Sequence, residues 1–254
     1  MSRIQKLFSK RNDKVIPFLT AGYPHKSHML KMVLAAEASG ASMVEIGMPF
    51  SDPLADGPVI QRASQVAIEN GVNIKWILET VEEIRVSSQI PLVLMGYINP
   101  IIKYGLVKFM EDCQIAGVDG LIIPDLPPEE AERFVQLARE KNISPILLVA
   151  PNTSSERIKI ISDFAGDLIY CVALMGITGS SENDMGNLTS YLDRVRENSS
   201  CPFVVGFGIK TRKDVKKINE LAHGAVVGSA IIDAMDGSVS PVDTVKKYIE
   251  NLVK

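Results

Sequence analysis

Cysteine and histidine are both scarce in this sequence. There are three of each in 254 residues. The cysteines lie far apart, at Cys113, Cys171 and Cys201, and the histidines are His25, His28 and His223. An odd number of cysteines at wide spacing is not the pattern of a disulfide framework, and neither residue type shows metal-ligand spacing. We therefore expect no metal, and free buried thiols in a reducing, cytoplasmic compartment.

Long apolar runs and an excess of positive charge are also missing. No segment approaches membrane-spanning length and none is a hydrophobic signal segment. The net charge of −3 and the pI near 5.7 give no basic surface for nucleic acid. The N-terminus starts basic, but Ile4, Leu7 and Phe8 fall on one helical face, which favours a short capping helix over a transit peptide. With 46% hydrophobic residues, the chain is expected to form one large α/β domain over residues 1–254.

Short apolar runs bounded by breakers are present from end to end. They are Val15–Thr20, Met43–Gly47, Pro91–Met95, Asp119–Ile123, Pro145–Ala150, Asp167–Ala173, Phe203–Phe207 and Ala225–Gly228. Eight such strands alternating with helical segments predict a (β/α)8 TIM barrel. A doubly wound open sheet is the alternative, but no Gly-x-Gly-x-x-Gly follows the first strand, which counts against a dinucleotide-binding fold.

Helix-start signals separate the apolar runs. Asn73 is in place to begin one helix as its N-cap, and Pro128 and Pro241 to open two others in the first turn. Thr153 and Glu156 have the spacing of a capping box.

Two strand-to-strand steps are longer than the rest. The step after the second strand holds an extra helix, Val59–Asn70, and the step after the sixth holds the polar, glycine-rich segment Gly176–Gly186. Loops at the C-terminal ends of barrel strands carry the active site. The Gly176–Gly186 segment is therefore a candidate lid over a substrate, with a flexible surface loop as the alternative.

An acidic stretch follows the second strand. Glu45 lies within an apolar run, where a carboxylate is costly unless it is paired, solvated or used. Asp52 and Asp56 follow in a loop rich in proline and glycine. Asp52 is better explained by turn formation, and Asp56 fits either a helix cap or a functional role. Glu45 is the strongest candidate for acid–base chemistry.

Glycine turns end the seventh and eighth strands. They are Gly206–Ile209 and Gly228–Ile231, and Ser229 would start an extra short helix, Ala230–Met235. In barrels the loops after strands seven and eight, together with such a helix N-terminus, commonly bind phosphate through backbone N–H groups. The substrate is therefore expected to be a phosphate ester.

Along nearly its whole length the sequence resembles the alpha subunit family of tryptophan synthase. The most specific motif is Glu45–Pro58, and supporting stretches are Pro17–Gly22, Leu94–Pro100, Pro124–Pro127, Gly176–Gly179 and Gly206–Ile209. The resemblance implies a lyase that cleaves indole-3-glycerol phosphate to indole and glyceraldehyde 3-phosphate in tryptophan biosynthesis. It also implies an α2β2 heterotetramer in which indole passes to a beta subunit that carries pyridoxal phosphate, with no cofactor in this chain.

The resemblance also implies roles for individual residues. Glu45 and Asp56 match the catalytic glutamate and aspartate, Tyr170 the tyrosine beside them, and Thr178 the lid threonine that meets Asp56. Positions that match the phosphate cradle are Gly179, Gly208, Gly228 and Ser229, and those that match the apolar indole pocket are Phe18, Ile60, Leu94 and Ile122. Met175 is a departure, because some members carry arginine there next to the lid.

Three rival functions remain in view. A metal-dependent phosphosugar epimerase would need histidines near strand ends, and an aldolase that forms a Schiff base would need a lysine inside a strand. A non-catalytic subunit that only activates a beta chain is the third, and the presence of both Glu45 and Asp56 argues against it.

Overall fold

The strands form a closed, all-parallel barrel in the order β1 to β8. The structure is a computed structural model that describes residues 1–173, 182–206 and 208–254. The strands are β1 (Val15–Thr20), β2 (Val44–Gly47), β3 (Leu92–Met95), β4 (Gly120–Ile122), β5 (Ser144–Val149), β6 (Ile169–Val172), β7 (Phe203–Gly206) and β8 (Ala225–Val227). The predicted (β/α)8 fold is confirmed.

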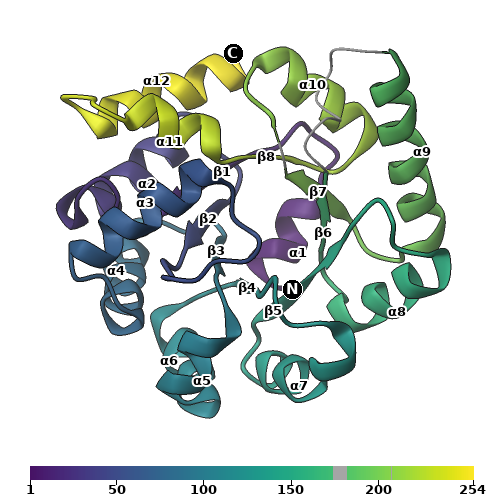
Figure 1. Ribbon diagram of the computed structural model, residues 1–254, viewed down its shortest axis with the longest axis horizontal. Helices are drawn as coiled ribbons and strands as arrows, with labels where there is room; N and C mark the ends of the chain where they lie inside the picture. Colours follow the sequence, from purple (N-terminus) through teal and green to yellow (C-terminus); the bar gives the residue numbers. More distant parts are fainter. Residues whose placement is uncertain (174–181, 207) are drawn as a thin grey trace.

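Helices surround the ring of strands, as Figure 1 shows. They are α1 (Arg3–Phe8), η1 (Lys26–His28), α2 (Met29–Ala38), α3 (Pro58–Glu69), α4 (Ile74–Ser87), α5 (Ile98–Tyr104), α6 (Leu106–Ala116), η2 (Pro128–Glu130), α7 (Glu132–Glu140), α8 (Ser155–Ala165), α9 (Glu182–Asn198), α10 (Arg212–Leu221), α11 (Ser229–Met235) and α12 (Pro241–Val253). The two predicted extra helices are confirmed as α3 and α11. Among the described residues, no helix combines the length and the apolar character that crossing a membrane would require.

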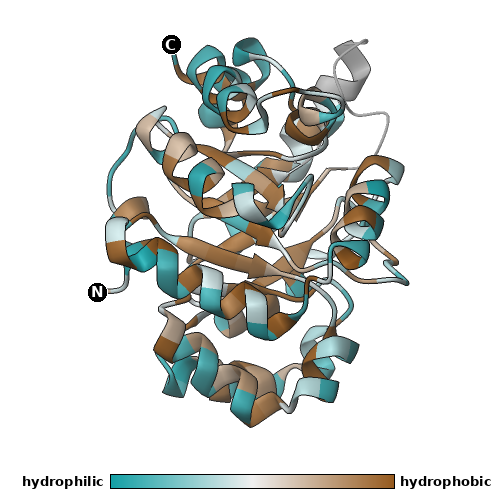
Figure 2. Ribbon diagram, turned by 90° about the vertical axis from the view of Figure 1, so that its left-hand side faces the viewer, coloured by the Kyte–Doolittle hydropathy of each residue, from teal (hydrophilic) through white to brown (hydrophobic). Residues whose placement is uncertain are grey.

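The register of the strands decides which side chains face the inside of the barrel. Phe18 of β1 pairs with Glu45 of β2, so their side chains share a face of the sheet. The ring of Phe18 lies against Gly47, two residues beyond Glu45 on the same face. The strands are apolar, whereas the outer faces of the helices carry most of the hydrophilic residues (Figure 2). Glu45 is therefore a carboxyl group placed on an otherwise apolar inner layer.

Helix α1 covers the end of the barrel at which the strands begin, and it is seen through the ring of strands in Figure 1. Ser2 and Gln5 form a capping box at its start. Ile4 is fully buried, and a Cβ on Gly120 of β4 would lie 3.0 Å from its Cδ1 atom. Arg3 donates to Asp119 at 3.0 Å, which ties the helix to the start of β4. The predicted N-terminal capping helix is thus confirmed.

Local details differ from the sequence-based expectations at three helices. Ser154, not Thr153, is the N-cap of α8, and it accepts a hydrogen bond from the Arg157 N–H, while the Thr153 hydroxyl instead accepts from the Ala150 N–H at 3.0 Å. Pro128 opens a single 3₁₀ turn, η2, before α7 begins. The candidate lid, Gly176–Gly186, lies mainly outside the described residues, and its last part belongs to α9.

Candidate active site

Glu45 is a fully buried carboxyl group near the C-terminal end of β2. Its exposed fraction is 0%, and neither carboxylate oxygen has a hydrogen-bond partner among the described residues. Burial disfavours the charged form and raises the pKa of Glu45 from its ordinary value of 4.5 to about 8. At neutral pH the free protein therefore holds Glu45 mainly as the neutral acid.

This buried acid has a consequence for stability. Between pH 4.5 and about 8 the folded chain keeps a proton on Glu45 that the unfolded chain has lost. Folding then takes up a proton, so stability falls as pH rises through this window. We expect the free energy of unfolding of the wild type to fall by a few kcal/mol relative to that of Glu45→Gln over that range, because a shift of one pKa unit corresponds to about 1.4 kcal/mol. Urea unfolding of both proteins at several pH values measures the difference, and parallel stability curves would contradict the raised pKa.

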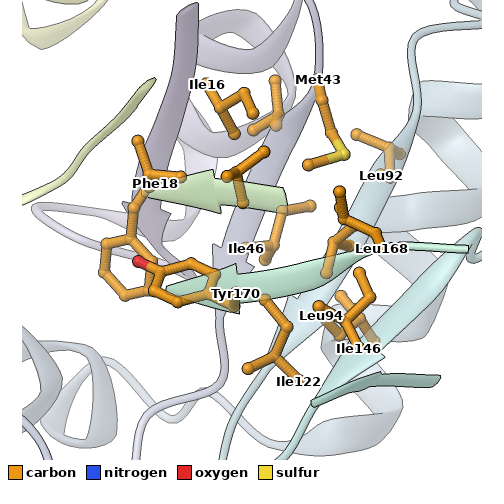
Figure 3. Close-up of a cluster of buried hydrophobic side chains, with 14 of the residues drawn as sticks. Ile16, Phe18, Met43, Ile46, Leu92, Leu94, Ile122, Ile146, Leu168 and Tyr170 are labelled. Carbon is orange, nitrogen blue, oxygen red and sulfur yellow. The ribbon is translucent and has the colours of Figure 1, made fainter. Parts of the chain in front are cut away.

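Two glycines make room for aromatic rings beside Glu45. A Cβ on Gly206 would lie 1.8 Å from the Tyr170 hydroxyl oxygen, and one on Gly47 would lie 2.4 Å from Cζ of Phe18. A larger residue at either position would displace the neighbouring aromatic ring. Figure 3 shows Phe18 and Tyr170 at one end of the buried hydrophobic cluster. Burial raises the pKa of Tyr170, and the charges of Glu45 and Asp56 raise it further, so these groups lie near one another.

Asp56 approaches the same region from the loop between β2 and α3. Tyr97, which follows β3, accepts a hydrogen bond from the Ala55 N–H at 3.0 Å and donates its hydroxyl proton to the Asp56 carboxylate. Partial burial raises the pKa of Asp56, and the Tyr97 hydrogen bond opposes that rise. Gln61 also donates to the Asp56 carbonyl oxygen at 2.8 Å. The loop is thereby held so that its acid faces the barrel.

Tyr97 was missed as a site residue by the sequence reasoning. Two features of the sequence could have identified it. It directly follows a barrel strand, and it lies within Leu94–Pro100, a stretch that resembles the family. The tyrosine is only 4% exposed, and its ring lies 5.3 Å from that of Phe50. Asp52, in contrast, is exposed and accepts a hydrogen bond from the neighbouring Ser51 hydroxyl at 2.5 Å, as a residue that shapes a turn would.

A hollow opens between the C-terminal ends of β1 to β4 and the Asp56 loop. Its walls are Phe18, Gly47, Met48, Asp56, Ile60, Ser64, Met95, Gly96, Tyr97 and Pro124. Phe18 and Ile60 are thus where the apolar pocket was expected, and Ile122 is fully buried in the adjoining cluster (Figure 3). Leu94 is placed differently: strand side chains alternate, so Leu94 points to the face opposite Met95 and packs in the core. Met95, the next residue, lines the hollow.

The expected phosphate-binding residues lie at the ends of β7 and β8. Gly208 has a φ of +64°, a left-handed conformation that favours glycine, and Ser229 is the first residue of α11. A Cβ on Gly228 would lie 3.3 Å from Cβ of Phe18, so this turn borders the apolar pocket. The other predicted residues of this region, Met175, Thr178 and Gly179, lie outside the described residues. In the part of the chain that the structure describes, no three His, Cys, Asp or Glu side chains could together hold a metal ion.

Comparison with known proteins places this geometry in a family. The family profile described as Tryptophan synthase alpha chain matches residues 4–253. The tryptophan synthase alpha chain of Petrotoga mobilis is 44% identical over 254 residues, which covers 100% of this chain and 98% of that one. That of Chloroflexus aurantiacus is 43% identical, with 100% and 98% covered.

Solved structures agree with the sequence relatives. Tryptophan synthase subunit alpha from Legionella pneumophila superposes with a TM-score of 0.92 at 33% identity, covering 99% of this chain and 97% of that one. A chain of the tryptophan synthase a2b2 complex from Pyrococcus furiosus gives 0.90 at 37% identity, covering 96% and 99%. The chain therefore belongs to the tryptophan synthase alpha chain family.

Proposed function

We propose that Glu45 and Asp56 carry out the cleavage of indole-3-glycerol phosphate, the lyase reaction of this family. The main support for this proposal is the environment of Glu45. Glu45 is a buried carboxyl group without a hydrogen-bond partner among the described residues, at the C-terminal end of a barrel strand and beside a hollow whose other wall holds Asp56. Burying such a group costs stability, so its place at the working end of the barrel favours a role in chemistry.

The raised pKa gives Glu45 the correct starting form. The neutral acid donates its proton to C3 of the indole ring and becomes a carboxylate. That carboxylate then accepts the proton of the side-chain hydroxyl, the hydroxyl oxygen forms the aldehyde carbonyl, and the electrons of the broken carbon–carbon bond return to the ring. One group thus donates and accepts one proton each, and it ends the reaction in its starting form.

Asp56 has the complementary role. Protonation at C3 spreads positive charge to the ring nitrogen, and an ionised Asp56 accepts a hydrogen bond from that N–H as the charge develops. The Tyr97 hydroxyl, which donates to Asp56, favours the ionised form against the effect of partial burial. Tyr97 is therefore a positioning residue for Asp56, with its own orientation fixed by the Ala55 N–H.

The remaining residues bind the two ends of the substrate. Phe18, Ile60, Met95, Ile122 and Tyr170 form the apolar surroundings of the indole ring. The turns at Gly208 and at Gly228–Ser229 receive the phosphate, and Gly179 and Thr178 complete the cradle and the lid. Holding both ends orients the bond that breaks, which lowers the entropic part of the barrier.

The proposal extends to the partner and the compartment. The chain functions as the alpha subunit of an α2β2 complex, and it passes indole to a beta subunit that carries pyridoxal phosphate, while it needs no cofactor of its own. The three cysteines are buried and free, which suits a cytoplasmic, reducing environment.

The direct test is release of indole from indole-3-glycerol phosphate by the purified chain, alone and with a beta subunit. We expect kcat/KM to fall as the pH rises through about 8, because the donor form of Glu45 is lost there. An active enzyme with no such decline would contradict the assigned role of Glu45. No indole release under either condition would favour the rival function, a subunit that only activates its partner.

A further inference from the structure

A second hollow lies at the opposite end of the barrel from Glu45. Two segments line it, and each leads into a strand: Phe8–Lys14 into β1 and Asn219–His223 into β8. A smaller hollow beside it, lined by Ser199–Pro202 before β7, shares Phe8, Arg196 and His223 with it. The strands β7, β8 and β1 are neighbours in the barrel. All strands are parallel, so this hollow lies where they begin, whereas Glu45 and Asp56 lie where they end. It is separate from the candidate active site.

Positive side chains outnumber negative ones around this hollow. Lys10, Arg11, Lys14 and Arg196 line it, together with Asp13 and Glu220. Arg196 pairs with Asp193 on its own helix through Nη1, and its Nη2 donates to the Leu221 carbonyl oxygen at 2.5 Å. Among the ion pairs of the described residues, none includes the other three cations. This local excess of positive charge contrasts with the net charge of −3 of the whole chain.

Lys14 is a buried cation that has only neutral acceptors. It is 2% exposed, and its Nζ donates to the carbonyl oxygens of Lys10 at 2.8 Å and Asn12 at 2.9 Å and to Oδ1 of Asn12 at 3.2 Å. These bonds fix the Lys10–Asn12 turn as a wall of the hollow. They satisfy the three N–H groups of the ammonium, and the charge of Asp13 offsets part of its positive charge.

His223 contributes a neutral donor beside these cations. Its Nδ1 accepts the Phe203 N–H at 3.2 Å, and its ring packs edge to face on Phe203 with centroids 5.0 Å apart. The proton of the neutral ring is therefore on Nε2. Burial lowers the pKa of His223, a backbone hydrogen bond with Phe203 opposes this, and the charges of Lys14, Arg196 and Arg11 lower it further. The carboxylates on the surrounding elements, Asp13, Asp193 and Glu220, do not reverse this effect.

We propose that this hollow binds a small multivalent oxyanion, specifically a phosphate group, between Arg11, Arg196 and His223. Arg11 supplies charge and planar N–H donors that suit phosphate oxygens. Arg196 supplies the guanidinium N–H groups that do not donate to Asp193 and Leu221, and the histidine supplies a further donor. Lys14 adds positive charge at the wall of the hollow. The bound anion relieves the repulsion among these cations. The ligand is inorganic phosphate or a small phosphate ester, which share the recognised group.

The test uses the histidine as a local reporter. The full-length chain is titrated with pH by NMR of its histidine rings, with and without inorganic phosphate, at an ionic strength held constant with sodium chloride. We expect phosphate to raise the pKa of His223 by about half a unit or more, because a bound anion favours the charged ring. His25 and His28 lie elsewhere and serve as internal controls, and His223→Gln assigns the signal. Glycerol 3-phosphate is tested in parallel, and a shift with both ligands identifies a site for esters, whereas a shift with inorganic phosphate alone identifies a site for the free ion.

Matched variants decide whether the effect belongs to this hollow. Arg11→Gln and Arg196→Gln should each weaken phosphate binding, read from the His223 signal, by about tenfold. Arg133→Gln, an exposed change on α7, should leave it unchanged. An equal shift with chloride alone would show general screening and overturn the proposal. So would an unaltered affinity in both hollow variants, since phosphate would then act from another site.

Discussion

Replacing Glu45 with glutamine is expected to lower the turnover of indole-3-glycerol phosphate by about 10²–10⁴-fold. The amide keeps the shape of the side chain but neither donates an acidic proton to C3 nor accepts the hydroxyl proton. The apolar and phosphate contacts of the substrate remain, so KM should change little. Steady-state release of indole by the purified variant, with and without a beta subunit, measures the effect.

A surface variant and stability measurements distinguish a loss of catalysis from a loss of folded protein. Glu69→Gln, at an exposed position on α3, should keep wild-type activity. Glu45→Gln should also be more stable than the wild type at alkaline pH, because it removes a buried acid that must ionise there. Low activity in a more stable protein cannot result from unfolding. Near wild-type turnover in Glu45→Gln would remove Glu45 from the mechanism.

The second large effect is expected at Asp56, where Asp56→Asn should reduce kcat by about 10²–10³-fold. Asparagine keeps an oxygen that can accept from both Tyr97 and the indole N–H, but it lacks the charge that stabilises the protonated ring. The loss should therefore appear in kcat more than in the binding of indole. Single-turnover cleavage and equilibrium binding of indole distinguish these two quantities.

Asp52→Asn is the matched control on the same loop. Asp52 is exposed, and its contact is with the adjacent Ser51, so the isolated chain should keep its activity when the charge is removed. Equal losses in both variants would show that the loop needs negative charge in general. The specific role of Asp56 in stabilising the ring cation would then be wrong.

The sequence predicted the barrel because its signals are local. Runs of four to seven mostly apolar residues between helical segments imply buried parallel strands, and eight parallel strands joined by helices are typical of a closed barrel. Glu45 was identifiable for the same reason, since a single acid interrupts a short apolar run. Each inference needs only the residue and its nearest neighbours in the chain.

Features that depend on partners from other segments could not be predicted in this way. The hydrogen bonds of Tyr97 reach residues 41 and 42 positions earlier, so its sequence context shows only a tyrosine after a strand. The sequence analysis assigned the pocket to Leu94, whereas the adjacent Met95 lines the hollow. Successive side chains of a strand point to opposite faces, so a shift of one residue changes the face. Ser154 and Thr153 are both good N-cap residues; Ser154 caps α8, while the Thr153 hydroxyl accepts from the Ala150 N–H.

Helix α1 has a further consequence for the order in which the protein folds. Helix α1 packs against Asp119 and Gly120 at the start of β4. The partner of Arg3 is therefore synthesised 116 residues later in the chain. The barrel beneath it is complete only when Val15 pairs with Ala225 of β8. During synthesis at about 5–20 residues per second, α1 therefore spends several seconds outside the ribosome without its site. The first helix to be made can therefore dock only after the residues at the start of β4 have been made.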